Sequence, residues 1–202
     1  WTVPEADARI TSGWFWAPSR KTPKSIEELG NMYFNSVGHN ATLLLNVPPN
    51  NQGTVDAAIL ERVEEFGENI KKSFAVNMAS MNGASVKASK VRGNSKSFGP
   101  GKTVDGDDST YWTTNDGETS GQLLIDLGSE KRFDVVSIEE AIQNGQHINS
   151  YKVEYRTGDG EWTTMDEGQT IGAKRLVRTA PVRADQVRIT VSCPEGMVPQ
   201  IS

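Results

Sequence analysis

This chain of 202 residues has little of several features that mark common protein classes. It contains a single cysteine, Cys193, so an intrachain disulfide is excluded. Its 21 Lys and Arg are outnumbered by 26 Asp and Glu. A nucleic-acid surface needs clustered positive charge, so this balance argues against a nucleic-acid partner. The longest apolar run, residues 41–47, is far shorter than the roughly 20 residues that span a bilayer. We therefore expect no membrane span.

The pattern of the sequence changes near residues 75 to 80. A capping box, Ser25 to Glu28, opens a helical pattern that Gly38 is placed to end. An unbroken apolar run over residues 41–47 is typical of a strand buried on both faces, and a second helical pattern covers residues 56–74. This order predicts an α/β segment made of the last units of a (β/α) barrel.

Short alternating segments separated by turn residues follow this α/β part. Residues 122–127, 133–138, 151–156 and 186–191 are predicted strands, and Gly158-Asp159-Gly160 is a hairpin turn after which Trp162 begins a return strand. The pattern predicts an all-β sandwich. We expect a barrel segment over residues 1–75 and a β-sandwich over 76–202, both cut from something larger, with the sandwich ending before its last strand.

Acids and aromatics are concentrated in the first 16 residues. Glu5 and Asp7 precede Trp14, Phe15 and Trp16. Aromatic rings cover the apolar face of a sugar, and glycoside hydrolysis requires a carboxylic acid and a second carboxylate. From composition alone, packing aromatics and loop acids are the better interpretation, because buried aromatics usually serve the core.

A series of motifs occurs in one order over residues 1–75. The motifs are residues 1–7, Gly13-Trp14-Phe15-Trp16, residues 24–29, Tyr33, residues 36–40, Leu43-Leu44-Leu45-Asn46-Val47-Pro48-Pro49-Asn50, Gly53, Leu60 and Phe66-Gly67. In this order they resemble family 29 glycoside hydrolases, the α-L-fucosidases, and the resemblance changes that interpretation. The form Trp-x-x-x-Glu-x-Asp at residues 1–7 is similar to the branch that prefers α-1,3/4-linked fucose, as in Lewis-type glycans.

The resemblance implies retaining hydrolysis by double displacement, with no cofactor for catalysis. Glu5 matches the acid/base by position, and Asp7 is the alternative or a group that tunes it. Trp14 and Trp16 are implied to line the fucose pocket. The Asp nucleophile is expected outside this chain, so the remainder of the barrel is an expected partner, with fucosylated glycans as substrate.

Two polar residues between these motifs are given structural roles. His39 follows the predicted first helix, and we interpret it as a cap or strand-entry residue. Asn46 ends the buried strand, and we interpret it as a backbone-bracing amide rather than a substrate ligand.

A second set of motifs covers residues 76–202. They are Asn77 with Ala79, residues 97–100, 104–107, 110–112, 126–128, 151–155, 160–162 and 187–189. These motifs are similar to the discoidin, or coagulation-factor C, domain and to family 32 carbohydrate-binding modules. The resemblance implies a discoidin-like jelly-roll sandwich.

This resemblance also implies a structural Ca²⁺ site. Its ligands would be the Lys102 carbonyl, the Asp105 carboxylate, the Asp107 carbonyl and Thr110 oxygens. Hard cations such as Ca²⁺ prefer such oxygens, although from the residues alone an ordinary Asp-Gly turn is the better interpretation of the loop.

Other residues of this part are assigned mainly to packing and surface. Trp112 and Trp162 are predicted to pack in the sandwich. Residues 143–147 are expected to form a loop near its tip, where His147, with Arg175 and Arg178, is more simply solvated surface than a sugar contact.

The predicted function is therefore part of a retaining α-L-fucosidase acting on α-1,3/4-linked fucose, with an accessory domain of the carbohydrate-binding type. The alternative is a non-catalytic carbohydrate-binding or structural module that only braces the barrel. The sequence does not fix the compartment; an extracellular or cell-surface bacterial location is favoured over a cytoplasmic one.

Overall fold

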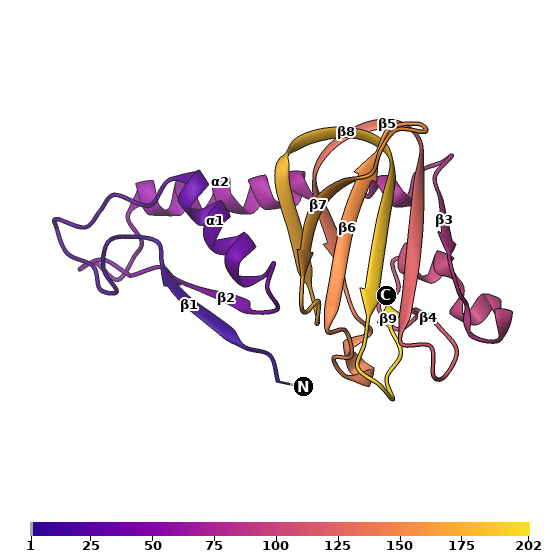
Figure 1. The fold of residues 1–202 in the computed structure, drawn as a ribbon. Helices are drawn as coiled ribbons and strands as arrows, with labels where there is room; N and C mark the ends of the chain where they lie inside the picture. Colours follow the sequence, from indigo (N-terminus) through magenta and orange to yellow (C-terminus); the bar gives the residue numbers. More distant parts are fainter. Residues whose placement is uncertain (1) are drawn as a thin grey trace. The chain divides into compact units, whose positions relative to one another are not determined.

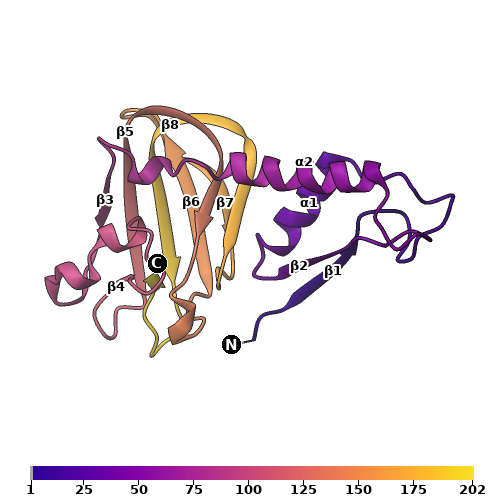
Figure 2. The same cartoon turned by 180° about the vertical axis from the view of Figure 1, so that it is seen from behind.

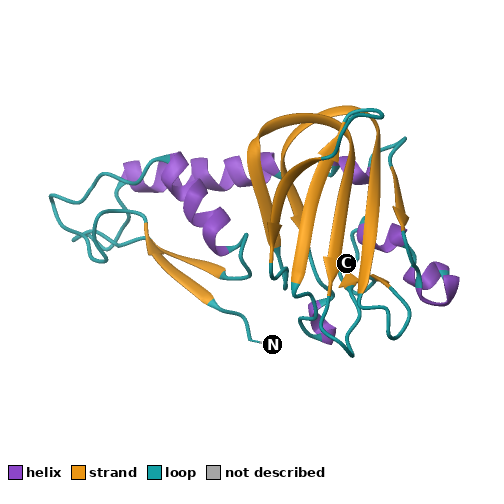
Figure 3. Cartoon of the chain, in the orientation of Figure 1, coloured by secondary structure: helices purple, strands orange, loops and turns teal. Residues whose placement is uncertain are grey.

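The computed structural model describes residues 2–202, and these form two compact units, Thr2–Val76 and Asn77–Ser202. The first unit mixes helices and strands, and the second is almost entirely strand and loop (Figure 1, Figure 3). The predicted order of an α/β segment followed by an all-β sandwich is confirmed. Each unit has its own hydrophobic core and is described separately below.

The first unit consists of two parallel strands and two helices. Strand β1 (Glu5–Arg9) pairs in parallel with β2 (Thr42–Asn46), from Glu5 beside Thr42 to Arg9 beside Asn46. Helix α1 (Ile26–Ser36) connects them and α2 (Ala57–Ser73) follows β2. Parallel strands joined through a helix are the repeating unit of (β/α) folds. A small core packs between strands and helices: Ile10, Leu29 and Ile59, with Met32, Leu45, Val47, Val55, Val63 and Phe66 against them.

The two helices begin differently. The Ser25 hydroxyl accepts the N–H of Glu28 at 3.1 Å, and the Glu28 carboxylate accepts the N–H of Ser25 at 2.8 Å, which confirms the predicted capping box. These hydrogen bonds, above all the one from the Ser25 backbone, lower the pKa of Glu28. Helix α2 has Asp56 at its N-cap, yet the Asp56 side chain makes no capping hydrogen bond. That carboxylate is used elsewhere, as described below.

The second unit is an antiparallel sandwich. One sheet has the strand order β3-β5-β8-β6-β7 and the other pairs β4 with β9 (Figure 1). The strands are β3 (Ser85–Ala88), β4 (Trp112–Thr113), β5 (Ser120–Ile138), β6 (Ser150–Arg156), β7 (Thr163–Gly168), β8 (Arg175–Ser192) and β9 (Gln200–Ile201). Five short 3₁₀ helices lie in its loops: η1 (Met78–Ser80), η2 (Arg92–Asn94), η3 (Lys96–Phe98), η4 (Pro100–Thr103) and η5 (Ile142–Asn144).

The sequence predicted two strands where the structure has one. Residues 122–127 and 133–138 both belong to β5, which follows β8 across two register shifts, between Asp126 and Lys131 and between Phe133 and Val135. The chain bends between the two parts, where Gly128 has φ +75° and a Cβ would lie 2.5 Å from the carbonyl oxygen of Gly83. Only glycine suits that close approach, so the turn signal marks a bend within a strand.

Trp112 and Trp162 both pack within the sandwich. Trp112 is fully buried in its core, and its indole N–H donates to the carbonyl of Lys90 at 2.8 Å, which confirms the predicted core position. Trp162 lies just before β7, which begins one residue later than predicted. The guanidinium carbons of Arg188 and Arg156 lie 4.2 and 4.6 Å from its ring centroid. Trp162 therefore packs against arginine side chains.

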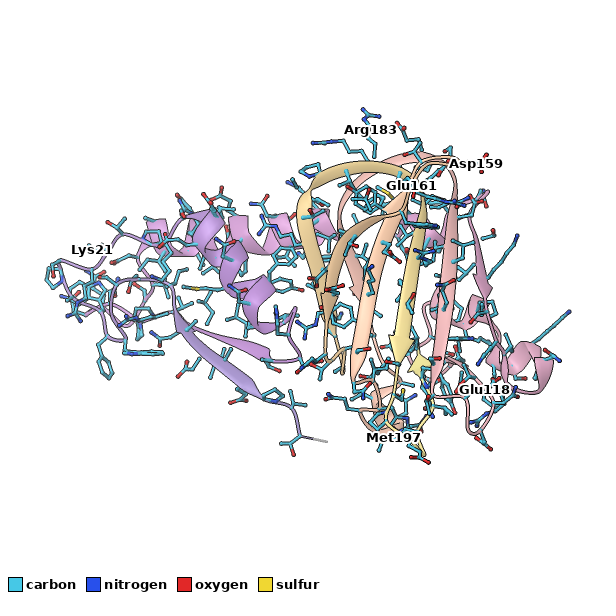
Figure 4. All side chains as sticks on the ribbon, in the orientation of Figure 1. Lys21, Glu118, Asp159, Glu161, Arg183 and Met197 are labelled. Atoms are coloured by element: carbon cyan, nitrogen blue, oxygen red, sulfur yellow. The ribbon has the colours of Figure 1, made fainter. Side chains whose placement is uncertain are left out.

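The two ends of the sandwich carry different loops. The hairpin that contains Asp159 and Glu161 lies with Arg183 at one end, whereas Glu118 and Met197 lie at the other (Figure 4). The C-terminal strand β9 and its partner β4 are also at the end that carries Glu118 and Met197, as the reverse view makes clear (Figure 2).

Candidate active-site loops and the oxygen-rich loop

The loops that follow β1 and β2 meet at the carboxyl end of the strand pair. The side-chain amide of Asn46, the last residue of β2, donates to the carbonyl oxygen of Trp14 at 2.8 Å. The backbone also joins the loops, because the N–H of Ile10 donates to the carbonyl of Asn46 at 3.1 Å. Enzymes built on parallel (β/α) units carry their sites at this end of the strands. The predicted role of Asn46 as a backbone-bracing amide agrees with this contact.

Trp14 presents its ring to solvent beside a cation. Its side chain is 42% exposed, and the guanidinium carbon of Arg9 lies 5.8 Å from the ring centroid. Arg9 is the last residue of β1, so both residues lie at the carboxyl end of that strand. Neighbouring Phe15 is 80% exposed. An exposed indole held by its backbone is suited to cover the apolar face of a ligand such as a sugar.

Trp16 is fixed through the start of the second helix. Its indole N–H donates to one carboxylate oxygen of Asp56 at 2.9 Å, and the side-chain amide of Asn50 donates to the other, also at 2.9 Å. The ammonium of Lys21, a loop residue marked in Figure 4, lies 5.6 Å from the Trp16 ring centroid. The hydrogen bond from Asn50, followed by the one from Trp16, lowers the pKa of Asp56. Asp56 thus remains a carboxylate that orients Trp16.

Glu5 lies away from these tryptophans. It is the first residue of β1 and is exposed, whereas Trp14 and Trp16 follow the last residue of that strand. Four residues of strand span about 13 Å. Asp7, exposed on the same side of β1, pairs with Leu44 in the middle of β2. The structure therefore does not bring Glu5 to the two tryptophans, and Asp7 lies between the two ends. Trp1, which begins the motif that suggested Glu5, lies outside the described residues.

Three residues of this loop cluster were missed by the sequence analysis: Arg9, Asn50 and Asp56. Asn50 was recorded only as the end of a motif and Asp56 only as the start of a helix. A local signal existed for Asp56, because aspartate is a strong N-cap residue, but that signal points to capping. Its partner Trp16 is 40 residues away in sequence. The contact of His39 agrees with its predicted structural role, because its Nδ1 lies 2.9 Å from the carbonyl oxygen of Phe34 in α1.

The predicted calcium loop of the second unit gathers oxygen atoms around Asp105. The hydroxyl of Thr110 lies 2.7 Å from one Asp105 carboxylate oxygen and 3.2 Å from the carbonyl oxygen of Asp107. The ammonium of Lys102 lies 3.2 Å from the same carboxylate oxygen. The Thr110 hydrogen bond is the main cause that lowers the pKa of Asp105.

This donor set fits a hard cation, because carboxylate, hydroxyl and carbonyl oxygens meet within one turn. It holds one carboxylate only: among residues 2–202 no three His, Cys, Asp or Glu side chains are grouped as a metal site. The Lys102 ammonium takes the place beside Asp105 that a cation would use. A bound Ca²⁺ would therefore displace the Lys102 ammonium from Asp105.

The predicted tip loop is held by buried contacts. The backbone N–H of His147 donates to the carboxylate of Glu140, and His147 Nδ1 lies 3.1 Å from the carbonyl oxygen of Val198. Arg175 donates to the carbonyl of Thr170 at 2.8 and 3.1 Å and lies 5.6 Å from the Tyr151 ring centroid. Arg178 is exposed on β8. His147 and Arg175 therefore stabilise the loops, which differs from the predicted solvated surface.

Comparison with known proteins gives a consistent result for both units. The model of the F5/8 type C domain matches residues 85–196. The chain is 38% identical over 180 residues to alpha-L-fucosidase 1 of Arabidopsis thaliana, which covers 88% of this chain and 35% of the plant protein.

Two solved structures extend this similarity to the fold. A Ruminococcus gnavus GH29 fucosidase in complex with fucose is 67% identical, with a TM-score of 0.98, over 100% of this chain and 40% of that one. The structure of SpGH29 is 36% identical, with a TM-score of 0.87, over 98% of this chain and 42% of its own. The chain therefore spans about two fifths or less of the length of these relatives.

Within residues 2–202, neither α1, α2 nor the short 3₁₀ helices have the length and apolar composition that a bilayer crossing requires.

Proposed function

Since this chain belongs to the F5/8 type C domain family, and its first unit is similar to GH29 fucosidases, we propose that it is the C-terminal part of a retaining α-L-fucosidase. The observation that carries the proposal is the 67% identity to a fucose-bound GH29 fucosidase over the whole chain. The discoidin-like sandwich would be an accessory domain of the carbohydrate-binding type. The Asp nucleophile would be supplied by a part of the enzyme outside these 202 residues.

The geometry of the first unit supports a place within a larger barrel. A two-stranded parallel sheet leaves hydrogen-bonding groups on both outer edges, and parallel sheets are normally covered on both faces. Leu44, in the middle of β2, is 53% exposed. Further strands beside β1 and β2 would pair these edges and cover Leu44. The exposed apolar surface is therefore consistent with the last βα units of a barrel.

The loop cluster at the carboxyl end supplies binding and orientation. Trp14 and Trp16 would cover the apolar face of fucose. Asn46 already holds the backbone carbonyl of Trp14, and Asp56 already holds the indole N–H of Trp16. Holding the rings before the substrate arrives reduces the conformational entropy lost on binding. These residues would position the sugar, and the nucleophile outside this chain would attack its anomeric carbon with retention of configuration.

The acid/base assignment of Glu5, with Asp7 as its alternative, stays a prediction. It is supported by the motif at residues 1–7 alone, since Glu5 lies at the amino end of β1. The preference for α-1,3/4-linked fucose in Lewis-type glycans has the same support.

The test uses the intact protein that contains this chain. It is incubated with Lewis a and Lewis x trisaccharides and with 2′-fucosyllactose, and released fucose is followed by NMR. We expect α-fucose to appear before β-fucose. We also expect the Lewis trisaccharides to be cleaved faster than 2′-fucosyllactose. Release of β-fucose first would exclude retention, and no release of fucose from any substrate would favour the alternative, a non-catalytic module.

We also propose a structural Ca²⁺ in the Asp105 loop. Its ligands would be the carboxylate of Asp105, the carbonyls of Lys102 and Asp107, and Thr110. The convergence of the Asp105, Asp107 and Thr110 oxygens within 3.2 Å supports it. A set with one carboxylate predicts modest affinity.

A further inference from the structure

The outer face of the large sheet carries two rows of polar side chains near one end. The registers place Ser192 of β8 between Ser120 of β5 and Ser150 of β6. The next row along the strands consists of Gln122, Thr190, Lys152 and Glu167. The residues that alternate with these rows, Leu123, Val191, Ile189 and Val153, lie in the core. Strand alternation therefore directs both rows to the outside of the sandwich.

The short side chains of these rows leave a hollow in the sheet surface. It has a volume of about 450 Å³, and its lining includes Ser120, Ser150, Ser192, Thr190, Lys152 and Glu167. This volume falls in the lower part of the range typical of small-molecule sites. The hollow lies at the end of the sandwich where β5 and β6 begin and β8 ends, the end that carries Glu118 and Met197 (Figure 4).

The chemistry of the lining is that of hydroxyl recognition. Ser150 and Ser192 are hydrogen-bonded to each other at 2.6 Å, and Gln122 donates to the Thr190 hydroxyl at 3.1 Å. A hydroxyl both donates and accepts, so each can also bond a ligand hydroxyl. Lys152 and Glu167 add one charge of each sign, and Lys152 is paired with Glu154 at 3.1 Å.

We propose that this hollow is a binding site for a neutral pyranose, either a free monosaccharide or a terminal unit of a glycan. A floor of hydroxyls with balanced flanking charges suits a ligand that itself carries only hydroxyls. An anion would meet the carboxylate of Glu167, which lines the hollow. The site deepens the proposed role of the sandwich and is separate from the Trp14 and Trp16 loops.

The test is a titration of the ¹⁵N-labelled full chain with fucose, galactose, N-acetylglucosamine and lactose, followed by amide chemical shifts. We expect saturable shifts at Ser150, Lys152, Gly168 and Ser192, with a Kd on the order of 1 mM. Shifts confined to residues 143–147, or no saturable shift with any of the sugars, would overturn the proposal.

Matched variants separate the hollow from the rest of the surface. Ser192→Gln fills the floor and is expected to raise the Kd at least about tenfold, whereas Ser137→Gln, at an exposed position in the other half of β5, should change it less than about twofold. If Ser192→Gln lowers the urea midpoint, Ser120→Gln at an exposed site replaces it. Equal weakening by the Ser137 variant would overturn the proposal. Fucose release by the intact protein is measured separately. It shows whether the proposed hydrolase activity holds, whatever the result for the hollow.

Discussion

Glu140 and Gly172 are hydrogen-bonded to each other in both directions. The N–H of Glu140 donates to the carbonyl of Gly172 at 2.9 Å, and the N–H of Gly172 donates to the Glu140 carboxylate at 2.6 Å. The other carboxylate oxygen accepts the N–H groups of His147 and Ile148 at 2.7 and 2.9 Å. One buried side chain, 3% exposed, therefore ties together the loop after β5 and the loop before β8.

Replacing this carboxylate by an amide should destabilise the sandwich. In Glu140→Gln one acceptor oxygen becomes an NH₂ group that faces an N–H donor, so at least one buried donor loses its partner. We expect the free energy of unfolding, measured by urea denaturation, to fall by about 2 kcal/mol. Glu139→Gln is the matched control, because Glu139 makes a partly exposed ion pair with Lys174 and its loss should cost less than about 0.5 kcal/mol. Equal effects of the two variants would contradict the role of Glu140.

Asp56→Ser tests whether the Asp56 carboxylate orients Trp16. Serine is a good N-cap residue, so helix α2 should keep its stability, whereas the hydrogen bond to the Trp16 indole is lost. In the intact enzyme we expect kcat/KM for a fucoside to fall about tenfold, with the urea midpoint unchanged.

A double-mutant cycle with Trp16→Phe distinguishes positioning from a general effect. Phenylalanine lacks the indole N–H, so Asp56→Ser should add little to the loss that Trp16→Phe causes alone. Fully additive losses would show that Asp56 acts by some route other than Trp16.

Glu5→Gln decides the acid/base assignment. If Glu5 protonates the leaving oxygen, the variant should lose about a hundredfold or more in kcat/KM on Lewis trisaccharides. It should retain most of its activity on an aryl fucoside, whose leaving group needs little protonation. Equal small losses on both substrates would agree with the position of Glu5 at the amino end of β1 and would remove it from the mechanism.

Calcium should stabilise the sandwich through the Asp105 loop. We expect millimolar Ca²⁺ to raise the Tm of the full chain by about 4 °C, and EGTA to reverse the shift, because a ligand that binds only the folded state stabilises it. Asp105→Asn should abolish the shift. Asp108→Asn, a substitution at a neighbouring exposed acid, should leave it intact. No shift in the unmodified chain would exclude a calcium site.

Cys193 should be unreactive while the chain is folded. Burial, together with the charge of Glu140, raises the pKa of its thiol to about 12. Little thiolate forms at pH 8, so a disulfide reagent such as DTNB should react only after unfolding in guanidinium. Because the folded pKa is raised, the buried thiol stabilises the fold below the ordinary thiol pKa of about 8.5, and this contribution is lost as pH rises toward 12. Rapid modification of the folded chain would contradict this.

Local patterns predicted the two helices and several of the strands. The Ser25–Glu28 capping box and a strand within residues 41–47 are present, but this strand is not buried on both faces as predicted, since Leu44 is 53% exposed. Capping depends on neighbours in sequence, whereas burial depends on elements that pack from elsewhere. The strands β1, β3 and β4 were not predicted, and β8 is longer than predicted. The turn signal at Gly128 is a bend within β5, since pairing with β8 continues on both sides of it.

The sequence by itself determined both helices, several of the strands, the two-part organisation, and the motifs that resemble fucosidases and discoidin domains. Only the tertiary structure decided which of the motif residues meet. Parallel pairing of β1 with β2 sets Glu5 at one end of the strands and Trp14 at the other, and it brings Asp56 to Trp16 across 40 residues of sequence. Such contacts depend on strand register and on the packing of loops from separate elements, which no local pattern encodes.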